Sequence, residues 1–240
     1  MTKLSVNINK VATLRNARGG NNPDLIAVAQ YIERLGAHGV TVHPRPDERH
    51  IRYQDVRDLR KVLQTEFNIE GYPSEEFIRL VLEVEPAQVT LVPDKPDQLT
   101  SNAGWDTKQN LEFLTKVVSR FKEKNIRVSI FISADCEMAE YAKRAGADRV
   151  ELYTEPYAAM YAKDATIAIA SFLKTAEYSK SIGLGVNAGH DLSLENLEYF
   201  CKTIKCIDEV SIGHALVCDA LYYGFESTIA KYLAQIDGEK

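Results

Sequence analysis

The sequence predicts a single-domain α/β protein with the closed (β/α)8 architecture of a TIM barrel. Short runs rich in Val, Ile, Leu and Phe alternate with helical patterns along the whole 240-residue chain. Eight such runs leave about 30 residues for each unit, which is the length of one βα repeat. Strict alternation requires a parallel sheet, and eight units with no spare element favour a closed barrel over an open sheet.

Each predicted strand is short and is bounded by Gly, Pro, Asn or a charged residue. The strands are expected at Leu4–Asn9, Gly39–His43, Phe67–Gly71, Gln88–Pro93, Arg127–Ile132, Arg149–Thr154, Gly185–Gly189 and Glu209–His214. The segments between them carry apolar residues at helical spacing, as in 25–32 and 111–121. No linker or low-complexity tract interrupts this order, so we expect residues 1–240 to form one domain.

Capping residues and glycines mark the predicted helix boundaries. Asn22 followed by Pro23 predicts a cap and a first helical turn, and Ser74 with two acidic residues after it predicts another helix start. Helix ends are expected at three glycines that stand just before strands, namely Gly36, Gly146 and Gly183. These signals support the alternation of strands and helices.

The composition excludes several classes of protein. Apolar residues make up 45% of the chain and charged residues 26%, which excludes a mostly disordered protein. A formal net charge of −5 argues against a nucleic-acid binder, because such proteins need a basic surface. No apolar run reaches the roughly 18 residues of a membrane span, and residues 1–10 lack the apolar core of a signal peptide. We therefore expect a cytoplasmic protein that binds neither nucleic acid nor a membrane.

Neither metal nor nucleotide cofactors are expected. The cysteines, Cys136, Cys201, Cys206 and Cys218, form no CxxC pair, and we expect them to be free thiols in a reducing cytosol. No Cys/His pair has the spacing of zinc ligands. The chain lacks GxxxxGK[ST], GxSxG and HExxH motifs, and the glycines of 183–189 run through a strand, which rejects a dinucleotide fingerprint.

The candidate functional residues lie where the predicted strands end, because a barrel builds its active site at the carboxyl ends of its strands. Four of the five histidines fall at this rim, whereas His38 lies at the amino end of a strand and is interpreted as a surface residue. The rim residues are Asn7, Asn9, Lys10, His43, Arg45, His50, Glu70, Thr100, Glu151, Thr154, Asn187, His190, Gly213 and His214. Such a concentration of titratable side chains favours catalysis over a purely structural role.

His43, His190 and Glu70 are the strongest candidates for proton transfer. His43 is held by Pro44, and a histidine titrates near neutral pH and can move protons. Glu70 has apolar neighbours that can raise its pKa, which suits a general base. A capped histidine and a salt-bridged rim glutamate are the structural alternatives. Glu151 alternates with apolar residues and ranks second for the same role.

Basic residues in more than one loop of this rim predict two phosphate sites. Arg45 and His50 lie after the second strand, and Arg18 lies in a flexible, glycine-containing loop before the first helix. Gly213 and His214 open onto the last helix, whose N-terminal amides suit an anion. Solvated basic loops without a ligand are the structural alternative.

Several segments, in this order along the chain, resemble the pyridoxine 5′-phosphate synthase family. They are Val6–Asn9, Ala12–Gly19, Thr41–Arg45, Arg49–Ile51, Asn68–Glu70, Leu91–Pro93, Val186–His190 and Ile212–His214. The match runs from residue 4 to about residue 220, and the ATLRNARG and NAGH segments together are highly specific.

The resemblance implies a cytoplasmic (β/α)8 enzyme that condenses 3-amino-2-oxopropyl phosphate with 1-deoxy-D-xylulose 5-phosphate. The products are pyridoxine 5′-phosphate, inorganic phosphate and water, and the family assembles as homo-octamers without a redox cofactor or a metal. By the same resemblance, His43 and Glu70 match proton acceptors and His190 matches the proton donor. The positions that match phosphate contacts are Asn7, Arg18, Gly213 and His214 for the aminoketone, and Arg45, His50 and Thr100 for the sugar.

Two places depart from the family pattern. Asn9 and Lys10 stand where many members have Asp-His, although Lys10 still supplies a charge for the sugar phosphate. Asp191 follows His190 where the family often has Gly, and a backbone contact there would survive the change. The long loop Asp94–Thr107 is expected to act as a lid that excludes water.

Two other functions remain open on the residues alone. A phosphosugar isomerase or epimerase on the same barrel would also use a strand-end Glu and His beside a phosphate site. The non-enzymatic alternative is a barrel that binds a ligand and has lost catalysis, which Asn9 and Lys10 keep open.

Overall fold

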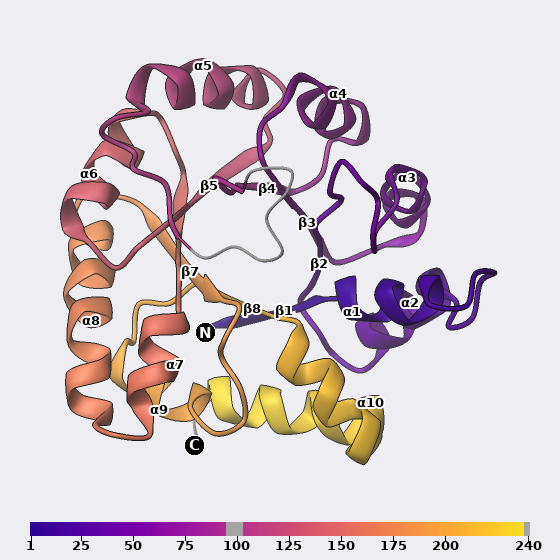
Figure 1. Cartoon of the computed structure of the whole chain (residues 1–240). Helices are drawn as coiled ribbons and strands as arrows, with labels where there is room; N and C mark the ends of the chain where they lie inside the picture. The colour runs from indigo at the N-terminus through magenta and orange to yellow at the C-terminus, as the bar shows by residue number, and fades with distance from the viewer. Residues whose placement is uncertain (95–102, 238–240) are drawn as a thin grey trace.

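Eight parallel strands close into a barrel in the computed structural model, which describes residues 1–94 and 103–237 (Figure 1). Each strand pairs with the next one in the sequence, and β8 pairs with β1 to complete the ring. The strands are β1 (Lys3–Asn7), β2 (Gly39–Val42), β3 (Glu66–Gly71), β4 (Gln88–Leu91), β5 (Arg127–Ile132), β6 (Arg149–Leu152), β7 (Gly185–Gly189) and β8 (Glu209–Ile212). The predicted closed (β/α)8 barrel is confirmed.

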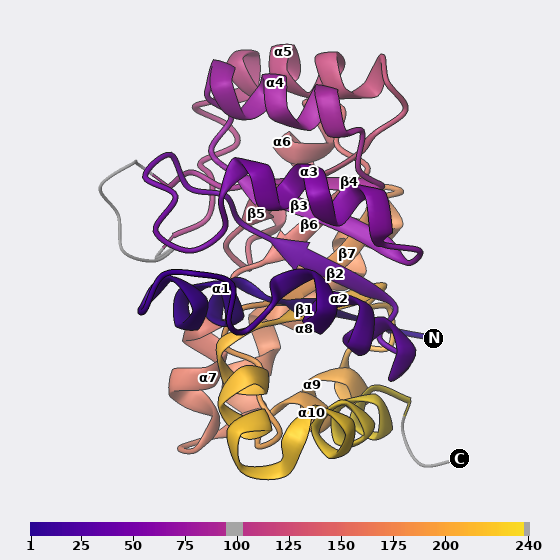
Figure 2. The same cartoon turned by 90° about the vertical axis from the view of Figure 1, so that its right-hand side faces the viewer.

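Within the described ranges, ten helices surround the strands (Figures 1 and 2). They are α1 (Asn9–Asn16), α2 (Leu25–Arg34), α3 (Tyr53–Val62), α4 (Glu75–Val84), α5 (Leu111–Lys122), α6 (Cys136–Arg144), α7 (Glu155–Tyr161), α8 (Ala165–Ser181), α9 (Leu197–Thr203) and α10 (His214–Asp237). The expectation of no spare element was wrong, because α1 and α7 precede the long helices α2 and α8. Each has only eight or seven residues, too few to show a clear amphipathic stripe in the sequence.

Several strands end earlier than the apolar pattern predicts. Sheet pairing stops at Asn7 in β1 and at Val42 in β2, so Asn9 and His43 have already left the ladder. The strands β4, β6 and β8 also end two residues before their predicted limits. His43, Val92 and Thr154 remain buried past the last strand pairs because the chain enters the packed rim of the barrel there, whereas His214 is exposed.

The helix boundaries agree with the predictions in part. The start predicted at Asn22 and Pro23 was wrong, because the Asp24 carboxylate accepts the first free backbone N–H groups of α2 and is its cap. Ser74 caps α4 as predicted. The three helix-ending glycines, Gly36, Gly146 and Gly183, have positive φ angles and are confirmed.

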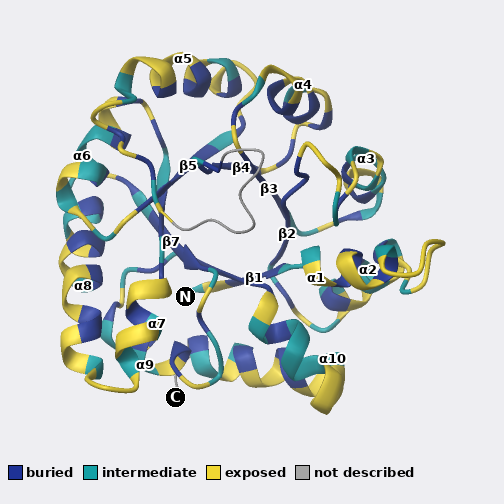
Figure 3. Ribbon diagram, in the orientation of Figure 1, coloured by how far each residue is buried: buried dark blue, intermediate teal, exposed yellow. Residues whose placement is uncertain are grey.

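The hydrophobic core lies between the sheet and the helices (Figure 3). Leu4, Val6 and Val40 are fully buried there, as are alternate residues of the other strands. The intervening strand residues are buried and largely polar, among them Ser5, Thr41, Asn68, Gln88, Thr90, Ser129, Glu151, Asn187, Glu209 and Ser211. Asn187 of β7 donates a hydrogen bond to Gln88 of β4 across the barrel at 3.4 Å. The interior is therefore a polar network, whereas branched apolar residues usually fill such barrels.

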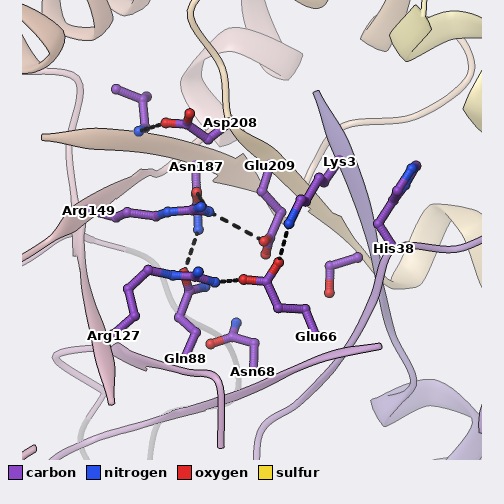
Figure 4. Close-up of polar contacts among 12 residues, drawn as sticks. Lys3, His38, Glu66, Asn68, Gln88, Arg127, Arg149, Asn187, Asp208 and Glu209 are labelled. Carbon is purple, nitrogen blue, oxygen red and sulfur yellow. Dashed lines mark hydrogen bonds and ion pairs between the residues drawn. The ribbon is translucent and has the colours of Figure 1, made fainter. Parts of the chain in front are cut away.

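Ion pairs lie at the amino end of the barrel, where each strand begins (Figure 4). Lys3 of β1 lies 2.8 Å from Glu66 of β3, and Arg127 of β5 pairs with the same carboxylate. Arg149 of β6 lies 3.5 Å from Glu209 of β8. These contacts link strands that are not neighbours in the sheet, so this end of the barrel is structural in character.

Candidate active site

The carboxyl ends of the strands surround a cavity of about 380 Å³. Most of the residues predicted from the sequence line it, namely Asn7, Asn9, Lys10, His43, Arg45, His50, Glu70, His190, Asp191, Gly213 and His214. Tyr153, Glu155 and Ser211 also line it and were not singled out in the sequence. The four rim histidines therefore meet in one place, while His38 lies at the opposite end and accepts a hydrogen bond from the backbone of Leu4.

Four candidate residues in the described part of the chain do not line the cavity, namely Arg18, Glu151, Thr154 and Asn187. Arg18 is exposed in the segment between α1 and α2 and does not line the cavity. Thr100 lies outside the described residues, as does most of the predicted lid Asp94–Thr107. The part these residues play stays a prediction.

His43 and Glu70 form the centre of the site. The backbone N–H of His43 donates to Asn9 Oδ1 at 2.9 Å, and the His43 Nδ1 lies 4.0 Å from Glu70 Oε2. Asn7 Nδ2 donates to the same Glu70 oxygen at 3.4 Å, and its own Oδ1 accepts from the Asn9 backbone. Asn9 thus holds the backbone at His43 through its oxygen, an interaction that an aspartate in this position would also make.

The buried surroundings of this pair disfavour the charged form of both members. Burial raises the pKa of Glu70 well above its ordinary value, and Glu151 and Asp94 raise it further. Burial also lowers the pKa of His43 well below its ordinary value, and Arg45 adds to the effect. These shifts favour a protonated carboxyl beside a neutral imidazole, and two such groups can exchange a proton without creating an isolated buried charge.

Glu151 lies below this pair inside the barrel and does not line the cavity. Burial, with a smaller contribution from Glu209, raises its pKa to about 8. A Cβ atom at Gly189 would lie 3.2 Å from Glu151 Oε1 and 2.5 Å from the Ser211 carbonyl oxygen. The glycine therefore leaves room for a second protonated carboxyl under the floor of the site.

His190 is held in a strained conformation beside the pair. It has a φ of +64°, which is uncommon for a residue other than glycine, and its ring packs on Phe131 with centroids 5.3 Å apart. Its backbone N–H donates to the Ser211 carbonyl at 3.2 Å. Burial lowers the pKa of His190, while the negative charges of Asp191 and Asp94 raise it. These opposing effects leave His190 better suited than His43 to carry a proton.

Asp191 lies at the exposed mouth of the cavity. Its backbone N–H donates to Thr154 Oγ1 at 3.2 Å, and Thr154 also contacts the Gly189 carbonyl. Burial raises the pKa of the Asp191 carboxyl, while His190 and His214 lower it. The Asp191 carboxyl therefore lies within the electrostatic influence of both histidines.

One end of the cavity is suited to an anion. Arg45, between two prolines, points its guanidinium Nη2 at Asp94 Oδ2, 2.5 Å away. His50 Nδ1 accepts the Ile51 backbone N–H at 2.9 Å, so the neutral ring carries its proton on Nε2. Burial, followed by Arg45 and Lys10, lowers the pKa of His50 to about 4. This end offers two cations and one neutral N–H donor.

The start of α10 is also suited to an anion. Its first residue, His214, follows Gly213, and a Cβ at Gly213 would lie 3.0 Å from the Cβ of Asn7. Glycine therefore lets the end of β8 approach β1 closely and turns the N-terminal amides of the helix toward the cavity. The two anion positions lie on either side of β1.

Asp94 is the most informative residue that the sequence interpretation missed. It lies shortly after the end of β4 at Leu91, so the same strand-end reasoning that found Glu70 could have found it. Ser211 precedes Ile212 and Gly213 and faces inward by strand alternation, which is the signal that was available for it. Tyr153 packs on Phe131 at 5.5 Å and carries no distinctive signal.

Residues 1–94 and 103–237 contain neither a candidate metal site nor a candidate membrane-spanning helix. In this part of the chain no group of three or more His, Cys, Asp or Glu side chains could hold a metal ion. None of the helices described is long and apolar enough to cross a bilayer. The four cysteines are free thiols.

Comparison with known proteins gives a consistent result. Residues 4–238 match the family described as "Pyridoxal phosphate biosynthesis protein PdxJ". The pyridoxine 5′-phosphate synthases of Phocaeicola vulgatus and Bacteroides thetaiotaomicron are each 66% identical over 232 residues, which is 97% of this chain and 98% of each relative. The 3-keto-L-gulonate-6-phosphate decarboxylase of Vibrio cholerae shares the fold, with a TM-score of 0.67, 13% identity, and coverage of 98% of this chain and 97% of that one. The chain belongs to the PdxJ family of pyridoxal phosphate biosynthesis proteins.

Proposed function

We propose that the protein is a pyridoxine 5′-phosphate synthase that condenses 3-amino-2-oxopropyl phosphate with 1-deoxy-D-xylulose 5-phosphate. The products are pyridoxine 5′-phosphate, inorganic phosphate and water. The observation that supports this most strongly is the convergence of His43, Glu70 and His190 on one cavity with an anion position on either side of β1. The reaction joins two phosphorylated substrates and needs repeated proton transfer, which this arrangement suits.

The protonation states suggest an order of roles. The raised pKa of Glu70 favours its protonated form, which suits donation of a proton to a departing hydroxyl, and Glu70 accepts a proton later. His43 begins neutral and accepts a proton from the carbon or nitrogen that is losing one. His190 is the proposed donor at the opposite side of the reacting atoms. The proton returns between His43 and Glu70 across the 4.0 Å that separates them.

Each of the two anion positions is proposed to bind the phosphate of one substrate. Arg45, His50 and Lys10 are proposed to hold the phosphate of the sugar, and the amides at Gly213 and His214 that of the aminoketone. Fixing both phosphates brings two flexible substrates together and lowers the entropic part of the barrier. Asn7 positions Glu70 and lies against Gly213, so it connects the proton-transfer pair with the second position.

Turnover of the two substrates tests this proposal. Purified protein mixed with both should release phosphate and form the pyridoxine chromophore, and His190→Ala should lose both signals. Isomerisation of a single sugar phosphate would instead favour the isomerase alternative. A chain that binds both compounds and turns over neither would favour the ligand-binding alternative.

We also propose, on the family resemblance, a cytoplasmic homo-octamer. The exposed apolar side chains of Leu221 and Tyr222, which are 73% and 86% exposed, suit a protein interface. Light scattering on the purified protein tests the assembly, and a monomer at micromolar concentration would contradict it.

A further inference from the structure

Arg45 and Asp94 form an ion pair in the wall between two cavities. Arg45 lines the main cavity of about 380 Å³, and both residues line a smaller neighbour of about 110 Å³ together with Tyr53 and Tyr72. The side chains of the pair are only 4% and 3% exposed. A phosphate that enters the main cavity therefore meets a guanidinium that is already engaged with a carboxylate.

The backbone around both partners restricts how the pair can rearrange. Arg45 lies between Pro44 and Pro46, and Asp94 follows Pro93 shortly after the end of β4. The guanidinium donates to Asp94 Oδ2 at 2.5 Å, which is short for such a bond. The carboxylate therefore holds the guanidinium in one orientation before any substrate arrives.

We propose that Asp94 is a resident counter-anion, which competes with phosphate for Arg45 and so limits how tightly the site retains inorganic phosphate. This rests on the proposed function, in which one substrate phosphate leaves as inorganic phosphate. A site with Arg45, Lys10 and a His50 N–H donor would otherwise hold that product well. Asp94 acts here as a positioning residue through Arg45.

Competition of this kind lowers the apparent affinity for an anion. Phosphate binds fully only to molecules in which Arg45 has turned from Asp94, and the measured affinity falls by the fraction of such molecules. Once phosphate leaves, Asp94 recaptures the guanidinium and the buried charge is again compensated. The pair thus favours release of the product and leaves Arg45 oriented for the next phosphate.

Titration with inorganic phosphate tests the idea without turnover. Calorimetry on the wild-type protein, Asp94→Asn, Arg45→Gln and the double variant should show about tenfold tighter binding in Asp94→Asn. This gain should be absent when Arg45→Gln is combined with it. Phosphate can also occupy the position at α10, and the Arg45→Gln isotherm isolates that contribution.

The chain offers a control in a second, partly buried pair of an arginine and an aspartate. Asp55 accepts two hydrogen bonds from Arg15 at 2.7 and 2.8 Å, and neither residue lines the cavity. Asp55→Asn should not tighten phosphate binding, since loss of a structural ion pair damages a site and does not improve it. Asp94→Ser serves as a second variant if Asp94→Asn does not fold.

Each outcome separates this inference from the proposed function. Unchanged or weaker phosphate binding in a folded Asp94 variant would overturn the role of Asp94, even if the wild-type protein makes pyridoxine 5′-phosphate. Tighter binding in a protein that makes no pyridoxine 5′-phosphate would leave the counter-anion intact and reject the proposed reaction. In an active enzyme, Asp94→Asn should also be inhibited by about tenfold less phosphate.

Discussion

Replacing Glu151 by Gln should stabilise the protein near neutral pH and flatten the pH dependence of its stability. Glu151 is 1% exposed, and burial with the charge of Glu209 raises its pKa from 4.5 to about 8. In the unfolded chain the same carboxyl ionises near its ordinary value. Between those two pKa values the folded protein holds a proton that the unfolded chain has released, so the free energy of unfolding falls as the pH rises.

The size of the effect follows from the width of that window. Each pH unit within it removes ~1.4 kcal/mol of stability from the wild-type protein. From about pH 5.5 to about pH 7.5, the wild-type protein should lose ~3 kcal/mol relative to Glu151→Gln, whose amide has no proton to release. Below the ordinary pKa of a glutamate, the two proteins should differ little from this cause.

Urea unfolding of both proteins at several pH values and one protein concentration measures the difference. Glu195→Gln is the control, because Glu195 is exposed beside α9 and its replacement should leave the pH dependence unchanged. If wild type and Glu151→Gln lose stability in parallel as the pH rises, Glu151 is ionised in the folded barrel and the reasoning fails.

The remaining predictions concern activity and packing. His43→Ala should lower kcat by about 10² to 10⁴-fold in a phosphate-release assay, and an unchanged kcat would point to a ligand-binding barrel. In the wild-type protein, kcat should decrease only when the pH is lowered below about 6.5, because burial lowers the pKa of His43. A pH–rate profile in which kcat already decreases at a higher pH would contradict this. Gly213→Ala should raise the KM for the aminoketone, because the new Cβ would lie 3.0 Å from Asn7 Cβ. Initial rates at varied aminoketone concentration measure this KM, and an unchanged value would contradict the prediction. Phe121→Ala should lower the free energy of unfolding by about 3 to 5 kcal/mol in urea titrations, since Phe121 is fully buried under the sheet; a much smaller loss would mean that the core collapses around the gap.

The polar interior links the site with the opposite end of the barrel. Glu151 lies between the cavity residue Glu70 and the structural pair of Glu209 with Arg149, and its pKa responds to Glu209. Burial is the main cause of the raised pKa of Glu70, and nearby carboxyl groups raise it further when they are ionised. The charge states of the site therefore depend on residues that no substrate touches.

The barrel itself was predictable because its signals are local. Apolar strands separated by helical stripes, and glycines such as Gly36 at helix ends, depend on neighbouring residues and on backbone geometry. The positions of His43, Glu70 and His190 at strand ends then placed them at one rim, since all parallel strands end on the same side. The short helix α1 escaped prediction because its eight residues carry too little pattern.

Contacts across the closed barrel could not be predicted in the same way. Arg45 and Asp94 are 49 residues apart, and no pattern in either segment predicts that the two side chains form an ion pair. Arg18 has the side chain expected of a phosphate ligand. It is nevertheless exposed and does not line the cavity.

By itself, the amino-acid sequence determined the order and number of the strands, the rim that carries the functional residues, and the kinds of side chain found there. The tertiary structure alone decided which of them meet, which carboxyls keep their protons, and which cation already has an anionic partner. The reason is that burial and distance set the energy of a charge, and both arise only when segments remote in the sequence pack together.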